Sequence, residues 1–278
     1  MMTVMIIGSI TEKSNSMSQI PAVLITGAST GIGATYAERF ARRGHDLVLV
    51  ARDVVRMEAL ASRLRQETSV KIDILQADLT QASDLAKVET RLREDARIGI
   101  LVNNAGTAIG GNFAEQNVDD MTRLITLNAT ALVRLARAIA PRLAEAGEGA
   151  IVNIGSVVGL APEFGMTVYG ATKAFVLFLS QGLALELGPK GVYIQAVLPA
   201  TTRTEIWDHV GVSVDAIGNV MEVGDLVDAA LIGFDRREPV TIPPLHDAGQ
   251  WDATDAARKA MLGNLVNALP AERYRTPA

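Results

Sequence analysis

The stretch Thr26-Gly27-Ala28-Ser29-Thr30-Gly31-Ile32-Gly33 decides the fold of this chain. It follows an apolar run at 21–25, which predicts a buried strand, and it opens a predicted helix that ends near Gly44. A strand, a glycine-rich turn and a helix make a phosphate site, because free backbone N–H groups and the positive helix end face an anion. The glycines permit a tight turn and the close approach of a pyrophosphate. The spacing G-x-x-x-G-x-G differs from the standard dinucleotide fingerprint, and a plain glycine-rich turn is the alternative interpretation.

Predicted strands and helices alternate along the rest of the chain. The hydrophobic pattern predicts further strands at 46–51, 70–76, 98–102, 150–154, 192–197 and 240–242, and helices at 54–66, 82–95, 118–144 and from about 169 to 187. This order predicts an α/β fold, a Rossmann-type doubly wound parallel sheet of about seven strands with helices on both faces. Ligands of such sheets bind beyond the carboxyl ends of the strands, where we therefore expect the functional residues.

Composition narrows the classes of function. The chain has 278 residues, 49% of them hydrophobic, which suits one large domain. A net charge of −5 without a basic block argues against nucleic acid as a partner. The chain has no cysteine, which excludes disulfides and thiolate chemistry and fits a cytoplasmic location. The three histidines are scattered, so no metal site is expected, and no apolar run approaches the roughly 18 residues of a membrane span.

The two ends of the chain differ from its middle. Residues 1–19 form an N-terminal extension; we expect residues 1–16 to be disordered and Met17 to be the natural start, with a short added strand or an oligomer arm as the alternative. Residues 20–248 form a single domain. Residues 249–278 form a helical C-terminal extension, with one amphipathic helix near 253–268 that packs on the domain or on a neighbouring subunit.

Tyr169 and Lys173 are four residues apart and therefore share a helix face. An ammonium beside a phenol favours the phenolate, and an opposite charge this close typically lowers a pKa by about 1–3 units. Tyr169 would then exchange a proton near neutral pH. Ser156 precedes Tyr169 by thirteen residues and lies just past a predicted strand. Taken alone, Y-x-x-x-K also fits an ordinary exposed helix face.

Together with Asn103-Asn104-Ala105-Gly106 and Asn128, these motifs resemble the classical short-chain dehydrogenase/reductase family, over about residues 20–245. The resemblance implies hydride transfer between a nicotinamide cofactor and a small carbonyl or alcohol substrate. It implies that Tyr169 is the general acid and base and that Ser156 binds the substrate oxygen. Lys173 would hold the nicotinamide ribose and lower the Tyr169 pKa, and Asn128 would anchor a water that passes protons to Lys173. Individually, Asn128 also fits a helix kink and Ser156 an ordinary loop.

Arg52 indicates the cofactor type. An acidic residue after the second strand would bind the ribose hydroxyl of NAD, whereas a guanidinium pairs with the 2′-phosphate of NADP. The predicted strand ends in Ala51-Arg52-Asp53, so NADP(H) is favoured and NAD(H) remains possible. In the alternatives, Arg52 is solvated and Asp53 only caps a helix, or Asp53 takes the NAD role because the strand ends one residue later.

The resemblance implies further cofactor contacts after the other strands. Asp78 and Leu79 would lie at the adenine; Asn104, Ala105 and Gly106 at the adenosine ribose; and Pro199, Thr202 and Thr204 around the nicotinamide. In the alternative interpretation these residues have structural roles only: Asp78 caps a turn or a helix, and residues 104–106 form a turn. Ala200 stands where the family has glycine, which makes the contacts of Thr202 and Thr204 less certain.

Substrate choice is expected from a loop at about 205–222, whose apolar residues could form a lid: Ile206, Trp207, Val210, Val212, Ile217 and Met221. Glu163 and Phe164 would line the opposite wall. No cationic cluster marks a docking surface for coenzyme A or an acyl-carrier protein, which favours a small or medium apolar carbonyl or alcohol. The helix 174–187 is apolar around most of its circumference, and the resemblance implies a homodimer or homotetramer. The alternatives are a redox-neutral epimerase or dehydratase and a non-catalytic NADP(H)-sensing regulator. The sequence sets neither the substrate nor the physiological direction.

Overall fold

The computed structural model describes residues 20–207 and 211–275. One sheet with the strand order β3-β2-β1-β4-β5-β6-β7 runs through the described chain, and every neighbouring pair is parallel. Its strands are β1 (Ala22–Thr26), β2 (Leu47–Ala51), β3 (Ile72–Gln76), β4 (Ile98–Asn103), β5 (Ala150–Ile154), β6 (Tyr193–Val197) and β7 (Val240–Thr241). The order reverses between β1 and β4, which confirms the predicted doubly wound Rossmann-type sheet.

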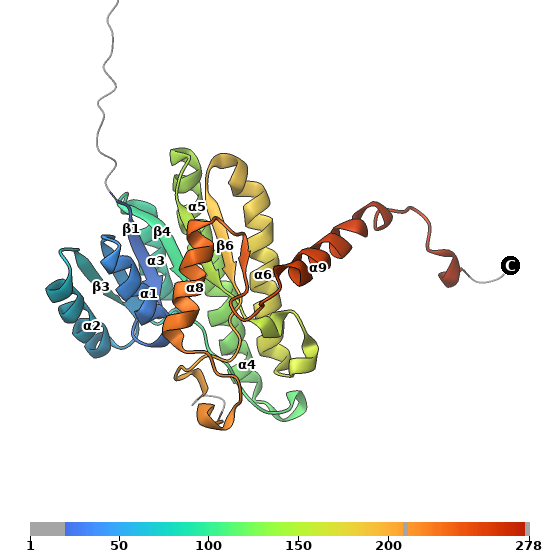
Figure 1. The fold of residues 1–278 in the computed structure, drawn as a ribbon, viewed down its shortest axis with the longest axis horizontal. Coiled ribbons are helices and arrows are strands. Elements are labelled where there is room, and N and C mark those ends of the chain that lie inside the picture. The colour runs from blue at the N-terminus through green and yellow to red at the C-terminus, as the bar shows by residue number, and fades with distance from the viewer. Residues whose placement is uncertain (1–19, 208–210, 276–278) are drawn as a thin grey trace, which may run out of the picture.

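Helices cover both faces of the sheet (Figure 1). The helices α1 (Gly31–Arg42), α2 (Val54–Glu67) and α8 (Val223–Asp235) share one apolar core with the sheet. The helices α3 (Ala82–Glu94), α5 (Leu132–Ala146) and α6 (Thr167–Leu187) share the other. Because both faces are covered, the central strands are continuous apolar runs, and every residue of β1, β2, β5 and β6 is buried.

The long helix predicted at 118–144 is not continuous. The chain forms α4 (Val118–Ile125), a π-helical turn at Thr126–Ala131 and then α5. Inside the π-helical turn the Asn128 side chain bonds to the backbone of Thr107 and to the Thr172 hydroxyl. A side chain held this way competes with the regular helix, and π turns of this kind concentrate at functional sites.

Two helical stretches are long and apolar enough to cross a membrane, by length and composition alone: Val118–Ala146 and Thr167–Lys190. This differs from the expectation that no apolar run approaches that length. Both stretches pack on the sheet, and α4 of the first contacts α6 of the second. A helix that covers a sheet is apolar on the side that it buries. The core they cover explains their hydropathy in part, since 44% and 33% of the two apolar windows are buried.

The chain ends lie outside the core. Residues 1–19 are outside the described residues, and so are the predictions made for them, including the one for Met17. The helix α9 (Ala248–Ala260) begins and ends earlier than the helix predicted at 253–268. None of its residues is buried, and Figure 1 shows it leaving the domain beside α6. Of this helix, Trp251 packs against the domain cluster that includes Leu177 and Leu198. The alternative, packing on a neighbouring subunit, stays a prediction.

Candidate active site

The glycine-rich turn joins β1 to α1 at the carboxyl edge of the sheet. Gly27 and Gly31 have φ angles of 65° and 53°, a region that favours glycine. A Cβ on Gly33 would lie 2.2 Å from the Gly27 carbonyl oxygen, so Gly33 is required by the packing of the turn itself. A Cβ on Gly31 would lie 3.2 Å from Cγ2 of Thr204, which brings the loop after β6 against this turn.

The end of β4 holds the turn in place. The Thr26 hydroxyl accepts the backbone N–H groups of Asn104 and Ala105, both at 3.0 Å. The Asn104 amide donates to the carbonyl oxygens of Thr26 and Gly27 at 2.9 and 3.2 Å. These bonds give Asn104 and Ala105 a structural role, as the alternative interpretation proposed. A ligand would meet this segment through the backbone of residues 104–106.

The N-terminus of α1 differs from that of α2. At α2, the Asp53 carboxylate accepts the Arg56 N–H at 3.0 Å and caps the helix. At α1, no described side chain caps the first turn, which begins after Thr30 and contains no acidic residue. The first N–H groups of α1, that of Ile32 included, and the N–H of Ser29 before the helix are therefore available to an anion. This donor set fits the diphosphate of a dinucleotide.

Arg52 is the first residue after β2, because the strand ends at Ala51. Its carbonyl oxygen accepts the Gln76 amide, and its exposed guanidinium forms no ion pair within the described part of the chain. Asp53 takes the capping role that one alternative gave it. The Arg52 guanidinium is free to bind a 2′-phosphate, whereas the Asp53 carboxylate is engaged in capping α2. This arrangement fits NADP(H) better than a nucleotide with a free ribose 2′-hydroxyl.

Asp78 and Leu79 follow β3, and the side chains of both make contacts within the domain. One Asp78 carboxylate oxygen accepts both the N–H and the hydroxyl of Thr80, at 2.9 and 2.7 Å, so Asp78 caps a turn as the structural alternative proposed. The Leu79 side chain is buried in the core. Leu79 could therefore meet a ligand only through its backbone.

Tyr169 and Lys173 lie in the first two turns of α6, and Ser156 lies just past β5. Nζ of the buried Lys173 is 5.5 Å from the Tyr169 ring centroid and donates to the Ile154 carbonyl oxygen at 2.9 Å. The Ser156 hydroxyl donates to the Pro199 carbonyl oxygen at 3.2 Å and accepts the Val158 N–H at 3.3 Å. The predicted acid–base residues are thus brought together at one place.

Burial sets the protonation of the pair. It raises the pKa of Tyr169 to about 12, an effect that the Ser156 hydroxyl opposes. Burial also lowers the pKa of Lys173 to about 8. The sequence predicted a lowered pKa for Tyr169, and this direction is wrong for the chain by itself, because burial outweighs any effect of the ammonium. Tyr169 is a protonated phenol at neutral pH.

Asn128 connects this pair to the turn after β4. Its amide oxygen accepts the Thr107 N–H, and its amide nitrogen donates to the Thr107 carbonyl oxygen, both at 2.9 Å. The same nitrogen donates at 3.2 Å to the Thr172 hydroxyl, which donates in turn to the Tyr169 carbonyl oxygen. A Cβ on Gly106 would lie 3.2 Å from the Asn128 amide oxygen and 3.7 Å from Nζ of Lys173. Gly106 therefore allows these two groups to converge.

The sequence analysis did not assign a role to Gly159, Gly170 or Thr172. The Thr172 hydroxyl links the Asn128 amide to the Tyr169 carbonyl oxygen. A Cβ on Gly159 would lie 2.6 Å from the backbone of Lys173 and Ala174, and one on Gly170 would lie 3.2 Å from the Val158 carbonyl oxygen. These glycines let the turn after Ser156 pack directly on α6. The small residues beside each motif, in V-V-G and Y-G-A-T, were the available signal.

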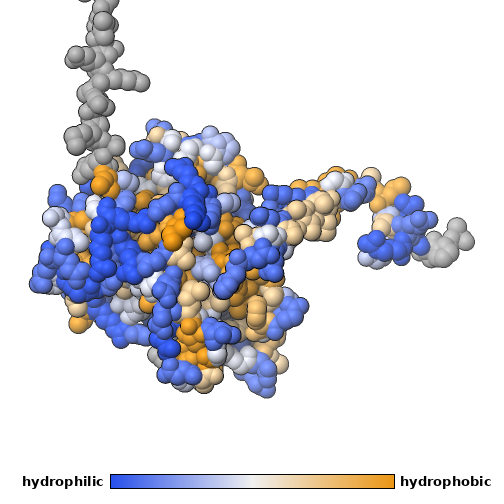
Figure 2. All heavy atoms as spheres, in the orientation of Figure 1, coloured by the Kyte–Doolittle hydropathy of each residue, from blue (hydrophilic) through white to orange (hydrophobic). Residues whose placement is uncertain are grey.

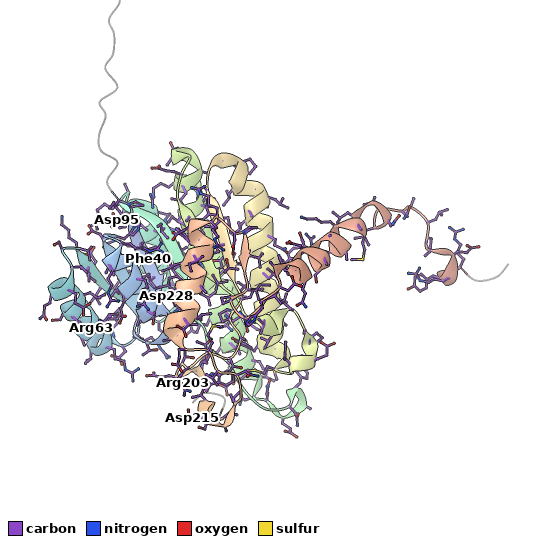
Figure 3. The ribbon with its side chains drawn as sticks, viewed as in Figure 1. Phe40, Arg63, Asp95, Arg203, Asp215 and Asp228 are labelled. Atoms are coloured by element: carbon purple, nitrogen blue, oxygen red, sulfur yellow. The ribbon has the colours of Figure 1, made fainter. Side chains whose placement is uncertain are left out.

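The loop after β6 is fixed mainly at its base. Thr202 is buried and pairs with Met221, and the Thr202 carbonyl oxygen accepts the Trp207 indole N–H at 2.9 Å. The Arg203 guanidinium bonds to Asp215 at 2.5 Å and to Glu222 at 2.9 Å; Figure 3 shows Arg203 and Asp215 together at this end of the molecule.

Several residues named as lid or wall are partly or largely exposed. Ile206, Ile217 and Met221 are partly exposed, and Val212 and the opposite-wall residues Glu163 and Phe164 are exposed. Val210 lies outside the described residues. No group of three histidine or acidic side chains within the described chain could hold a metal.

A family model described as short chain dehydrogenase matches residues 21–213. Among curated proteins, very-long-chain 3-oxoacyl-CoA reductase-A of Danio rerio is 36% identical over 190 residues, covering 66% of this chain and 59% of that protein. The reductase of Bos taurus is 35% identical over 187 residues, with coverages of 66% and 60%. The chain thus matches only about three fifths of the length of these curated relatives.

Solved structures match more of the chain. A short-chain dehydrogenase from Sphingobium yanoikuyae in complex with NADPH is 68% identical, with a TM-score of 0.91, and the match covers 92% of this chain and 100% of the other. A bulky-bulky ketone specific alcohol dehydrogenase from Comamonas testosteroni is 64% identical, with a TM-score of 0.87 and coverages of 92% and 99%. Coverage this high extends into the C-terminal tail. The sheet order, the uncapped turn, the Ser156–Tyr169–Lys173 cluster and the family match lead to one conclusion: this chain belongs to the short-chain dehydrogenase family.

Proposed function

We propose that this protein is an NADP(H)-dependent oxidoreductase that interconverts a carbonyl compound and an alcohol, with Tyr169 as the general acid and base. The observation that carries the proposal is the cluster of Ser156, Tyr169 and buried Lys173 beside an uncapped helix end. The solved relative at 68% identity is described in complex with NADPH, which supports the cofactor. Family membership supports an enzyme acting on CH–OH and C=O groups.

The residues that would hold the cofactor follow from their positions. The glycine-rich turn and the first N–H groups of α1 bind the diphosphate, and the guanidinium of Arg52 binds the 2′-phosphate. Asp78, Leu79 and the backbone at 104–106 lie on the adenosine side. Lys173 holds the nicotinamide ribose, and Pro199, Thr202 and Thr204 lie around the nicotinamide.

NADPH, when bound, supplies the hydride that reduces the carbonyl carbon. The Tyr169 phenol, protonated at neutral pH, donates its proton to the carbonyl oxygen, and Ser156 stabilises the charge that develops on that oxygen. Lys173, whose pKa is about 8, and Asn128 return a proton toward Tyr169 from solvent. In the oxidative direction Tyr169 accepts the proton from the alcohol.

We propose ketones with two large apolar substituents as the substrate class. The Comamonas testosteroni relative, at 64% identity, is described as specific for bulky-bulky ketones. The segment that follows Ser156 exposes the apolar side chains of Leu160 and Phe164, and the loop after β6 exposes Val212, which supports a wide apolar entrance. We further propose a cytoplasmic homodimer or homotetramer.

The test follows NADPH absorbance while purified enzyme is mixed with diaryl ketones, small ketones, aldehydes and 3-oxoacyl thioesters. NADH and Tyr169→Phe serve as controls. Turnover with NADPH and a diaryl ketone, lost in Tyr169→Phe, is expected. If NADPH binds and no substrate changes its redox state, the oxidoreductase proposal fails; a redox-neutral enzyme or an NADP(H) sensor then takes its place.

A further inference from the structure

An ion pair joins the loop after β6 to the beginning of α2. The Arg56 guanidinium donates through Nη1 to both carboxylate oxygens of Glu205, at 2.9 and 2.7 Å. The two residues are 149 positions apart in the chain, and both side chains are about half exposed. In the sheet, β5, β4 and β1 lie between β6 and β2. The ion pair therefore connects the two halves of the doubly wound sheet.

The segment that leads to this pair crosses the carboxyl edge of the sheet. The Pro199 carbonyl oxygen accepts the hydroxyl of the catalytic serine, so the segment begins beside the catalytic cluster. Cγ2 of Thr204 would lie 3.2 Å from a Cβ on Gly31, in the glycine-rich turn. The next residue, Glu205, forms the ion pair with α2. Residues 199–205, called the strap below, thus run from the catalytic cluster past the proposed diphosphate site to the helix after β2.

Arg56 lies at the same helix end as Arg52. Asp53 caps α2, and its carboxylate accepts the Arg56 N–H three residues later, at 3.0 Å. The Arg56 guanidinium turns back toward the cap, since its Nε lies 3.5 Å from the same carboxylate. A side chain at this third helical position reaches back over the helix end. A phosphate bound by Arg52, directly before the cap, is therefore close to the Arg56 guanidinium as well.

The charges favour an exchange of partners at Arg56. Its pair with Glu205 is exposed, and Figure 2 shows a largely hydrophilic surface around α2, so water screens the pair and little holds it closed. A phosphate monoester carries about −1.5 to −2 charges and three acceptor oxygens, more than a carboxylate. A 2′-phosphate beside Arg52 is therefore the stronger partner for the Arg56 guanidinium.

We propose that Arg56 exchanges partners when NADP(H) binds: it leaves Glu205 for the 2′-phosphate, and the strap is released at its Glu205 end. Arg56 is then a second determinant of the choice of cofactor, because a nucleotide with a free ribose 2′-hydroxyl leaves the Arg56–Glu205 pair closed. The exchange couples the adenosine end of the cofactor to the loop at the substrate entrance. The inference rests on the proposed function, since it begins from an NADP(H) site at Arg52.

The fluorescence of Trp207 tests the release of the strap. Trp207 is one of two tryptophans, lies two residues after Glu205, and donates its indole N–H back to the Thr202 carbonyl oxygen. Adenosine 2′,5′-bisphosphate carries the 2′-phosphate without nicotinamide, and it should change this fluorescence. Adenosine 5′-diphosphate at saturation should not. The change should be absent in Trp207→Phe, which lacks the reporter, and in Glu205→Gln, whose strap is released from the start.

Calorimetry of the full chain with the same two nucleotides tests the partners of Arg56. Arg56→Met should bind the bisphosphate about three- to tenfold more weakly, because a charge-assisted contact at an exposed site is lost. Glu205→Gln should bind it about two- to fivefold more tightly, because no exposed ion pair has to open. In Arg56→Met/Glu205→Gln this gain should disappear, since the carboxylate no longer competes for a guanidinium. Arg63→Met, which removes exposed pairs with Glu38 and Glu67 farther along α2, should bind both nucleotides as wild type does.

The results separate the exchange from the cofactor assignment. If wild type prefers the bisphosphate and Arg52→Asp loses that preference, the assignment of NADP(H) stands. Unchanged Trp207 fluorescence at saturation, or wild-type affinity in Arg56→Met, would then overturn the exchange alone. A gain from Glu205→Gln that persists without Arg56 would also overturn it, because the carboxylate would act by repulsion only. Equal binding of the two nucleotides by wild type would overturn both the exchange and the assignment.

Discussion

The cluster around Lys173 and the loop after β6 border the same site but are held in different ways. In the cluster, Nζ of Lys173, the Asn128 amide and the Ser156 hydroxyl each bond to backbone atoms and are buried. In the loop, Thr202 pairs with Met221 at the base and accepts the Trp207 indole N–H. The other described side-chain ties are exposed ion pairs, of Arg203 with Asp215 and Glu222 and of Glu205 with Arg56. A buried group bonded to backbone moves only with the fold, whereas exposed ion pairs contribute about 0–1 kcal/mol each.

The difference separates two properties of the site. The proton-transfer geometry depends on the core and should respond to substitution in an all-or-none manner. The shape of the substrate entrance depends on weak surface ties and should respond gradually. Substitutions in the two regions should therefore differ in the size of their effects.

Tyr169→Phe removes the proton and keeps the ring. We expect kcat to fall by about 10²- to 10⁴-fold, because a positioned acid contributes that much. NADPH affinity, measured by fluorescence titration, should change less than about threefold, since the hydroxyl has no part in holding the diphosphate. Retained turnover would remove Tyr169 from the acid role.

Arg52→Asp places a carboxylate where we propose the 2′-phosphate. NADPH affinity should fall by about 10- to 100-fold, because a charge-assisted contact is lost. NADH affinity should stay within about threefold, and Arg65→Asp, in the last turn of α2, serves as the charge control. Equal losses for both cofactors would contradict the assignment of NADP(H).

Lys173→Met tests the burial of the ammonium through stability. The folded pKa of about 8 lies below the ordinary value of 10.5, so between these values the unfolded chain binds more protons. Stability of the cofactor-free enzyme should therefore gain about 2 kcal/mol from Lys173 between pH 8 and 10. In Lys173→Met this gain should be absent, which urea unfolding at the two pH values measures.

The control for this experiment is Lys190→Met, at an exposed position after α6. Tyr169 does not interfere, because its folded pKa of about 12 costs stability only above its ordinary value of 10. The same pH dependence in Lys173→Met and wild type would mean that the Lys173 ammonium is not desolvated.

Local patterns predicted the parallel sheet and the pairing of Tyr169 with Lys173, whereas Ser156 and Asn128 were implied by the family resemblance. Continuous apolar runs mark buried strands, and Tyr169 and Lys173 face each other through helical spacing alone. The interruption of the helix at Asn128 was foreseen only as a kink, and the direction of the Tyr169 pKa was predicted wrongly, since both depend on contacts between distant segments. The close packing at Gly159 was missed for the same reason.

Arg203→Met is expected to have the smallest effect. It removes the ties to Asp215 and Glu222 and leaves the backbone pairing of the loop base with Met221 intact. KM for a bulky ketone should rise about two- to fivefold with kcat nearly unchanged, because two exposed ion pairs contribute little each. Added salt should raise KM in wild type toward the variant, since it screens the same pairs. Arg236→Met, which removes an exposed pair with Glu238 at the far end of α8, should change neither constant. A loss of kcat as large as that of Tyr169→Phe would mean that the loop and the cluster form one cooperative unit, and the separation between them would fail.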